Sequence, residues 1–224
     1  MKQEMYCDPC PLCSTQGAEL YHQDANKRSQ RPYHQCIECH LVFVPSAFYL
    51  SQQQEKAEYD LHENVLNDEG YRQFLLRFLN PFKDKLVADA NVLEFGCGPG
   101  PALASMMGDL GYQVSLYDHF YYSDKTVLRQ GFYDGISATE VIEHVHDPKA
   151  VFESLISLLK PSGVLGLMTK LVQGPEAFSR WHYKNDMTHV CFYSEATFQW
   201  LAQRYALTLS FHGADVILLE RRRG

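Results

Sequence analysis

Residues 91–120 read NVLEFGCGPGPALASMMGDLGYQVSLYDHF and carry the clearest indication of architecture in the chain. An apolar run over 92–95 leads into a glycine-rich turn, a helix is expected over 101–110, and a second strand over 113–117 ends at Asp118. This order predicts a βαβ unit. Glycines let a ligand approach the backbone, the helix N-terminus offers free N–H groups, and a carboxylate after the second strand can bind both hydroxyls of a ribose. The unit therefore predicts a ribose-containing cofactor at the edge of a parallel sheet.

The glycine-rich turn reads E-F-G-C-G-P-G, which departs from the dinucleotide form G-x-G-x-x-G. Here the chain resembles the class I S-adenosylmethionine-dependent methyltransferases, whose first motif is D/E-x-G-x-G-x-G. Their motif and their ribose-binding acid fall in register on Glu94, Gly96, Gly98, Gly100 and Asp118. The resemblance implies a Rossmann-like, seven-stranded sheet with one antiparallel strand and S-adenosylmethionine lying across the strand ends. An NAD-type Rossmann domain is the alternative.

The resemblance extends from about residue 89 to the end of the chain. The segment DGISATEVIEHVHDPKAVFESLISLLKPSGVLGLMT looks like the family's fourth strand, its following helix and its fifth strand. A helix with Ser194 as N-cap and a closing hairpin are expected after it. Asp118 and Asp134 lie only 16 positions apart, where the family places a helix and a third strand. The sheet is therefore expected to be shortened around the third strand, and the residues that contact the adenine are not assigned.

Two CxxC pairs near the N-terminus predict a metal site. Cys10 and Cys13 form one pair, and Cys36 and Cys39 form the other. Two thiolates at each tight turn supply the four sulfurs of a closed tetrahedral site, for which zinc is the expected, structural ion. Cys7 leaves an ambiguity, because a Cys7-x2-Cys10 pair is also possible. The following apolar run over 41–45 resembles a bacterial group that carries such a ribbon before a methyltransferase domain.

These motifs divide the chain into three expected parts. They are a zinc ribbon over 1–48, a helical connecting segment over 49–88 and a methyltransferase domain over 89–224. In the connecting segment, apolar residues repeat at helical spacing and Pro81 is expected to end or bend the helix. Tyr59, His62 and Arg72 are polar or amphipathic, and the segment could cover a site.

The string TEVIEH, residues 139–144, is the first candidate for the reaction site. Ligands bind at the carboxyl ends of strands, so Thr139 and Glu140 are expected near the sulfonium, and Cys97 lies in the glycine-rich turn. Glu140, Glu143 and His144 are expected on one side of a helical turn. The E-x-x-E-H string resembles the metal-binding string of small-RNA 2′-O-methyltransferases and of polyprenyl-catechol O-methyltransferases. A second divalent ion and an acid/base role both remain open for these residues.

The second candidate is the loop WHYKNDMTHVCFYS, residues 181–194, which carries many ionisable and aromatic groups after the fifth strand. His189 is expected as the fourth partner of the E-x-x-E-H set or as a general base. His182 is a further candidate for chemistry. The alternative for either histidine is an ordinary surface group.

Composition bounds the class of function. The chain has 224 residues, 46% of them hydrophobic, and a net charge of −7, which argues against broad phosphate-backbone binding. No stretch predicts a signal peptide or a membrane span, and the CxxC cysteines suit a reducing compartment, so a cytoplasmic protein is expected. We therefore expect a methyltransferase that acts on a small-molecule oxygen, carbon or nitrogen nucleophile. An RNA methyltransferase that docks RNA through its ribbon and a non-catalytic cofactor-binding protein are the alternatives.

Overall fold

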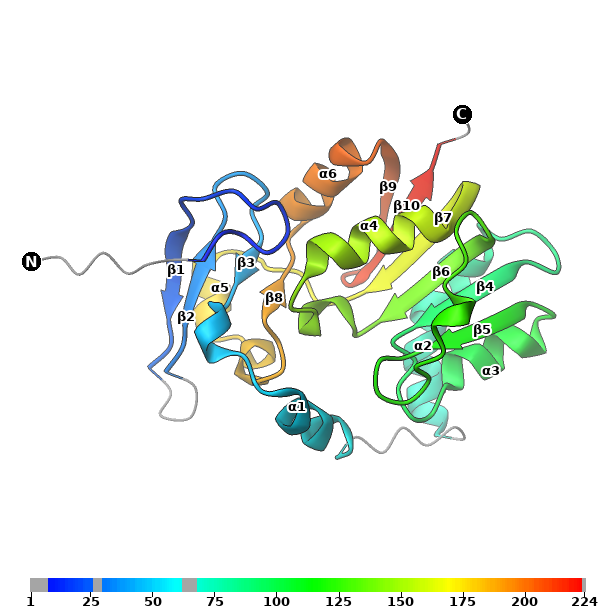
Figure 1. Cartoon of the computed structure of the whole chain (residues 1–224), viewed down its shortest axis with the longest axis horizontal. Coiled ribbons are helices and arrows are strands. Elements are labelled where there is room, and N and C mark those ends of the chain that lie inside the picture. The colour runs from blue at the N-terminus through cyan, green and yellow to red at the C-terminus, as the bar shows by residue number, and fades with distance from the viewer. Residues whose placement is uncertain (1–7, 26–29, 62–67, 223–224) are drawn as a thin grey trace, which may run out of the picture.

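The computed structural model describes residues 8–25, 30–61 and 68–222. Two β-sheets of different size stand side by side, and helices cover both faces of the larger one (Figure 1). Cys7 and His62, which were considered above, lie outside the described residues.

The larger sheet has six strands in the order β5-β4-β6-β7-β10-β9. The first four are parallel, and β10 runs antiparallel to both of its neighbours. The strands are β4 (Asn91–Phe95), β5 (Gln113–Tyr117), β6 (Tyr133–Thr139), β7 (Leu159–Met168), β9 (Leu207–His212) and β10 (Val216–Arg221). This sheet confirms the Rossmann-like fold class, the single antiparallel strand and the closing hairpin.

The sheet has six strands where the resemblance implied seven. Between β5 and β6 the chain forms a bridge between Asp118 and Tyr122 and a short 3-10 helix, η2 (Lys125–Val127). This connection is too short for both a covering helix and another strand, as the spacing of Asp118 and Asp134 had predicted. β5 is consequently the edge strand of the large sheet.

Four helices sandwich the large sheet. α2 (Glu69–Lys83) and α3 (Ala102–Asp109) share one apolar core with its first face, while α4 (Pro148–Leu158) and α6 (Glu195–Arg204) share another with its second face. Figure 1 shows α2 and α4 on opposite sides of the strands. The fit on the first face is close, because α2 packs onto strand glycines. A Cβ on Gly166 would lie 2.6 Å from a ring carbon of Phe82, so a larger residue there would displace the helix.

The connecting segment contains two helices. α1 (Gln52–Tyr59) begins with a capping box formed by Ser51 and Gln54. The side chain of Asp68 caps α2, which runs two residues beyond Pro81 and ends at Lys83. Pro81 therefore lies in the last turn of α2 and does not break it.

The smaller sheet, which we call the ribbon sheet, has the order β1-β2-β3-β8. Three of its strands come from the N-terminal part, and the fourth comes from the loop after β7. They are β1 (Glu19–Gln23), β2 (Pro32–Gln35), β3 (Val42–Phe43) and β8 (Cys191–Phe192). One apolar core extends from the ribbon sheet to the second face of the large sheet. The ribbon thus takes a strand from outside residues 1–48 and is joined to the larger unit.

In the part of the chain that the structure describes, no helix combines the length and the apolar character needed to cross a membrane.

Candidate functional site

The two CxxC pairs form matching tight turns. The N–H of Ser14 donates to the carbonyl of Cys10, and the N–H of His40 donates to that of Cys36. Ser14 and His40 both have a positive φ, of 64° and 58°. Each turn therefore folds back so that its two sulfurs point in the same direction.

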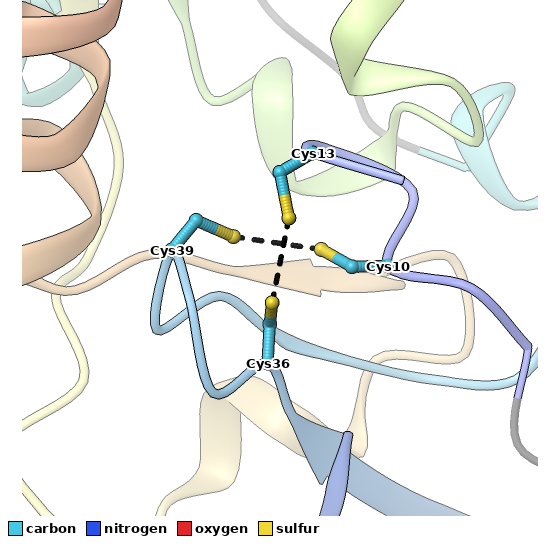
Figure 2. A group of neighbouring side chains, drawn as sticks. All are labelled: Cys10, Cys13, Cys36 and Cys39. Atoms are coloured by element: carbon cyan, nitrogen blue, oxygen red, sulfur yellow. Dashed lines mark hydrogen bonds between the residues drawn. The ribbon is translucent and has the colours of Figure 1, made fainter. Parts of the chain in front are cut away.

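The four sulfurs converge on one point (Figure 2). Sγ of Cys10 lies 3.5 Å from Sγ of Cys39, and Sγ of Cys13 lies 3.4 Å from Sγ of Cys36. All four Sγ atoms lie within 4.8 Å of one another, and all four cysteines are free thiols. Zinc–sulfur bonds of about 2.3 Å in a tetrahedron need sulfurs about 3.8 Å apart. The expected ligand set is thus assembled, and its geometry suits a zinc ion.

The glycine-rich turn, residues 96–100, lies at the carboxyl end of β4. Gly96 and Gly98 have φ values of +74° and +62°, which side chains disfavour. A Cβ on Gly96 would also lie 2.5 Å from Cγ2 of Val141. Two features therefore disfavour any side chain at position 96: the backbone conformation and the close approach of the TEVIEH segment. Gly100 ends the turn, and its carbonyl accepts from the N–H of Ala102 at the start of α3.

Asp118 lies beside this turn at the end of β5. Its Oδ2 accepts from the N–H of Gly98 at 2.9 Å, and its Oδ1 accepts from the N–H groups of Phe120 and Tyr121 at 2.8 and 3.1 Å. These bonds fix the carboxylate next to the glycine-rich turn. The structure thus brings the expected ribose-binding acid to the expected motif.

Glu94 points into the same region from β4. Its side chain is buried, and Oε2 has no hydrogen-bond partner among the described residues. Burial raises the pKa of Glu94 to about 8, partly opposed by a hydrogen bond from the backbone of Ala104 in α3. Cys97 is also buried beside it, and burial raises the pKa of its thiol. A buried, unpartnered carboxyl oxygen is suited to binding a polar ligand group.

The TEVIEH segment follows β6 at the neighbouring strand end. Thr139 ends β6, Glu140 has a φ of +54°, and a 3-10 helix, η3 (Ile142–His144), follows. Glu143 has 0% exposed area, and its Oε1 accepts a short hydrogen bond from the hydroxyl of Tyr183. Burial, together with the nearby charge of Glu140, raises the pKa of Glu143 to about 8.

Glu143, His144 and His189 form one group, here called the Glu143 group. Each offers a ligand atom, and these atoms lie within 4.8 Å of one another. The sequence had placed Glu140 in the same set, but among the described residues its carboxylate does not belong to this group. Its left-handed backbone separates Glu140 from the helical turn that carries Glu143 and His144. Burial raises the pKa of Glu140, partly opposed by the charges of Lys170 and Arg77.

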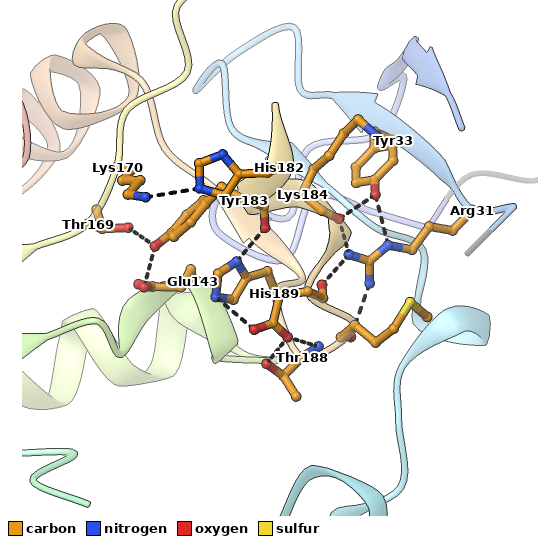
Figure 3. Close-up of polar contacts among 12 residues, drawn as sticks. Arg31, Tyr33, Glu143, Thr169, Lys170, His182, Tyr183, Lys184, Thr188 and His189 are labelled. Carbon is orange, nitrogen blue, oxygen red and sulfur yellow. Dashed lines mark hydrogen bonds and ion pairs between the residues drawn. The ribbon is translucent and has the colours of Figure 1, made fainter. Parts of the chain in front are cut away.

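His189 is held by the backbone of its own loop (Figure 3). Its Nδ1 lies 2.8 Å from the carbonyl oxygen of Tyr183. A carbonyl only accepts, so Nδ1 carries the proton and Nε2 has the free lone pair of the neutral ring. Burial lowers the pKa of His189, opposed by the charge of Asp186, whose Oδ2 lies 3.8 Å from Nε2. The neutral imidazole can accept a proton or bind a metal through Nε2.

His182 lies elsewhere. It is exposed, and its Nε2 lies 3.4 Å from Nζ of Lys170. Tyr183, which sequence reasoning placed in the loop without a role, is instead the residue that meets Glu143, and Thr169 lies 3.2 Å from its hydroxyl. In the sequence, the indication of such a role for Tyr183 was its position between His182 and Lys184. Among the loop residues, the structure thus brings His189 and Tyr183, and not His182, to Glu143.

Helix α1 lies beside both parts of the site. The ring of Tyr59 meets that of His144 edge-on at 5.4 Å and lies 5.8 Å from that of Phe120, which follows Asp118. Glu55 pairs with His146 at 2.7 Å. Of the polar residues considered in the connecting segment, Tyr59 is at the site, while Arg72 lies 4.0 Å from Asp109 of α3.

Comparisons with known proteins agree with this architecture. The model of a family described as "Methyltransferase domain" matches residues 67–210, more than half of the chain. A protein named "Ubiquinone biosynthesis O-methyltransferase" from Xanthomonas axonopodis pv. citri is 34% identical over 133 residues, which cover 46% of this chain and 55% of that protein. A protein of the same name from Xanthomonas oryzae pv. oryzae is 33% identical over the same length. The chain thus spans about half the length of these curated relatives.

Solved structures show the same fold at low identity. A "SAM dependent methyltransferase" from Archaeoglobus fulgidus is 14% identical with a TM-score of 0.52, and the match covers 67% of this chain and 99% of that one. A chain from the complex of the Haloferax volcanii Trm112 methyltransferase activator and a putative methyltransferase is 11% identical with a TM-score of 0.55. That match covers 75% of this chain and 98% of the other. Both confirm the Rossmann-like methyltransferase fold.

Proposed function

The chain belongs to the methyltransferase domain family, and we propose that it transfers a methyl group from S-adenosylmethionine to an oxygen atom of a small-molecule acceptor. The observation that carries this proposal is the position of the Glu143 group. Glu143 and His144 follow closely after β6, and Val141 of the same segment packs against Gly96 of the glycine-rich turn. A cofactor in that turn and an acceptor at the Glu143 group would therefore be neighbours.

The cofactor would occupy the edge formed by β4 and β5. Asp118 would accept the ribose hydroxyls with the lone pairs that its backbone bonds leave available. The open backbone of Gly96, Gly98 and Gly100 would let the cofactor approach closely, and Glu94 would receive its amino acid part. We place Cys97, Thr139 and Glu140 next to it, because they flank the glycine-rich turn and the end of β6.

The reaction needs a nucleophile behind the methyl group and a destination for its proton. An acceptor hydroxyl held about 3 Å from the methyl carbon would form the new C–O bond as the C–S bond breaks. Its proton would pass to Nε2 of His189, which bears a lone pair because Nδ1–H donates to Tyr183. S-adenosylhomocysteine and the methyl ether are the products.

A divalent ion at the same three residues is the alternative to a proton-accepting His189, because Nε2 would then bind the ion and could not take the proton. Glu143, His144 and His189 offer a mixed oxygen and nitrogen donor set, and Oε2 of Glu143 is buried with no partner among the described residues. When bound, such an ion makes a coordinated hydroxyl easier to deprotonate. Tyr183 would then orient Glu143 through its hydrogen bond, while Lys170 and His182 would lie at the outer side of the acceptor site.

The acceptor class is supported by the relatives and by the site. The similar proteins are named as O-methyltransferases of ubiquinone biosynthesis, and the Glu143 group offers a base for a hydroxyl. The rings of Tyr59 and Tyr183 contact His144 and His189, and the ring of Phe120 lies against that of Tyr59, an arrangement that suits a planar phenolic acceptor. The four-cysteine cluster would hold a structural zinc ion, and the reducing cytoplasm would keep its thiols available.

Cofactor titration followed by methyl transfer tests this proposal. We expect calorimetry to show S-adenosylmethionine binding that weakens at least about tenfold in Asp118→Asn and more in Asp118→Ala, because the ribose loses a charged acceptor. Asp109→Ala, at an exposed position in α3, is the matched control. Labelled S-adenosylmethionine should then methylate simple catechols. Cofactor binding that is unchanged in both Asp118 variants would contradict the assigned site.

A further inference from the structure

Arg31 is a buried charged residue far in sequence from the proposed site. Its exposed area is 0%, and it follows the residues 26–29 that the structure does not describe. Its guanidinium reaches across to the loop after β7. There it donates to the carbonyl of Lys184 at 2.7 Å, to that of Asp186 at 2.6 Å and to that of Met187 at 3.1 Å. A single side chain of the ribbon thus binds three carbonyls of one short segment (Figure 3).

Tyr33 completes this attachment. Its hydroxyl accepts from Nε of Arg31 at 2.9 Å and donates to the carbonyl of Lys184, also at 2.9 Å. Its ring packs edge-on against Phe178 and Phe192 at 5.1 and 5.6 Å. Arg31 therefore cannot turn away without breaking bonds to both the ribbon and the loop. A planar guanidinium suits this role because its donors point in fixed, divergent directions.

The other end of the same loop is joined to the ribbon by backbone bonds. β8 pairs with β3 through Phe43 and Cys191, and the N–H of Val44 donates to the carbonyl of Val190 at 2.9 Å. The N–H of Val190 in turn donates to the carbonyl of Glu143 at 2.8 Å. One residue, Val190, therefore connects the ribbon sheet to the turn that carries Glu143.

His189 lies between these two attachments. Arg31 holds the carbonyls of residues 184, 186 and 187, Val44 holds residue 190, β3 holds residues 191 and 192, and the carbonyl of Tyr183 orients the His189 ring. Resting on the function proposed above, we propose that Arg31 is a positioning residue that fixes His189 and Tyr183 against Glu143. The ribbon is then part of the acceptor site, not a separate module for docking a partner.

The chemistry of Arg31 favours positioning over a general stabilising role. Its bonds to the loop go to backbone carbonyls, so they fix the path of the loop whatever the side chains of Asp186 and Met187 are. An amine can reach fewer of these carbonyls at once, because it lacks the flat fork. Replacement by lysine is therefore expected to retain the charge but to lose the loop geometry.

Hydrogen exchange of the intact, zinc-loaded chain tests the proposal without any substrate. The reporters are the amides of Thr188, His189 and Val190, which donate within the loop and to Glu143. In Arg31→Met we expect these amides to exchange at least about tenfold faster, and in Arg31→Lys by an intermediate factor. Arg180→Met is the matched control, because the side chain of Arg180 is exposed and its ion pair within the described residues is with Glu176. Its exchange is expected to match the wild type.

Tyr33→Phe is a second, milder variant that tests the proposal if Arg31→Met loses its zinc or fails to fold. It removes one hydroxyl and keeps the ring packing, and about threefold faster exchange at the same amides is expected. Unchanged exchange in a folded Arg31→Met chain, or faster exchange spread evenly over the large sheet, would overturn the proposal. In Tyr33→Phe, exchange at the wild-type rate would overturn it as well.

Two further readouts separate this proposal from the proposed function. S-adenosylmethionine affinity is expected to stay within about twofold in all Arg31 variants, because the hydrogen bonds of Arg31 go to Tyr33 and the loop and not to Asp118 or the glycine-rich turn. With a catechol acceptor, kcat is expected to fall about tenfold or more in Arg31→Met while the KM for the cofactor is unchanged. Loss of cofactor binding already in the wild type would refute the function alone, whereas wild-type kcat in Arg31→Met would refute the positioning role.

Discussion

The two clusters of potential metal ligands in this chain differ in how they are built. The four-cysteine cluster takes four identical sulfurs from two local turns, and these would fill the tetrahedral shell of a zinc ion. The Glu143 group takes one carboxylate and two imidazoles from segments whose histidines, His144 and His189, lie 45 positions apart. Its three ligands leave coordination positions for water or an acceptor. Closed sites of the first kind are structural, and open sites of the second kind suit catalysis.

The difference also lies in what holds each cluster in place. The turns of Cys10 and Cys36 are closed by their own backbone hydrogen bonds. The Glu143 group depends on distant contacts, because Arg31 and β3 position the loop that carries His189. The two cysteine turns are thus local structures, whereas the Glu143 group relies on contacts from the ribbon sheet. Loss of a zinc ligand is expected to disturb the Glu143 group, while loss of one side chain of the Glu143 group should leave the four-cysteine cluster intact.

Removal of a zinc ligand should have the largest effect. We expect Cys39→Ser to lose its zinc and several kcal/mol of stability, since metal binding supplies much of the folding free energy of such small units. The checks are metal analysis and the unfolding midpoint in urea. Cys191→Ala is the matched control, because Cys191 is buried in β8 but lies outside the four-cysteine cluster. Cys191→Ala should retain zinc. If Cys39→Ser kept the full stability of the wild type, the four-cysteine cluster would not be a structural site and would not differ from the Glu143 group in this respect.

Glu94 should make the stability of the large sheet depend on pH. Its pKa is raised from 4.5 to about 8, so the protonated carboxyl is favoured in the fold. The stability that this carboxyl contributes is fully present below pH 4.5 and is lost as the pH rises through about 8. We expect the stability of the wild type relative to Glu94→Gln to fall by roughly 3 kcal/mol between pH 5 and pH 8. Urea unfolding at several pH values measures this, and parallel curves for the two proteins would contradict the assigned burial.

Variants of the two neighbouring glutamates should separate the Glu143 group from the cofactor site. Glu143→Gln is expected to lower kcat about hundredfold, as loss of a group acting on the acceptor does. Glu140→Gln should instead raise the KM for S-adenosylmethionine about tenfold or less, because Glu140 lies outside the group. Both variants should keep one zinc per chain. A lowered kcat in Glu140→Gln together with a raised cofactor KM in Glu143→Gln would exchange the roles assigned to these residues.

The sequence predicted those features that depend on short-range patterns. The glycine-rich turn, Asp118 and the two CxxC pairs are local motifs whose spacing dictates their geometry, and the structure assembles them as expected. The shortened connection after β5 was readable from chain length. His189 was expected as a partner of the E-x-x-E-H string because its loop is rich in ionisable and aromatic groups and follows the fifth strand.

Features that depend on distant backbone pairing escaped prediction. β8 has two residues and pairs with a strand about 150 positions earlier, so no periodicity marks it. Arg31 lies in a stretch with other polar residues, and only the fold shows that its donors meet carbonyls of residues 184–187. Glu140 was placed in the metal set on the assumption of a regular helical turn, which its φ of +54° interrupts.

A single crystal structure would show the metal and the cofactor together. The zinc-loaded chain would be crystallised with S-adenosylhomocysteine and data collected at the zinc absorption edge. We expect a full anomalous peak among Cys10, Cys13, Cys36 and Cys39, with the ribose on Asp118 and the cofactor sulfur turned toward the Glu143 group. Zinc held at full occupancy by Glu143 and not by the cysteines, or a cofactor bound away from Gly96 and Gly98, would contradict this expectation.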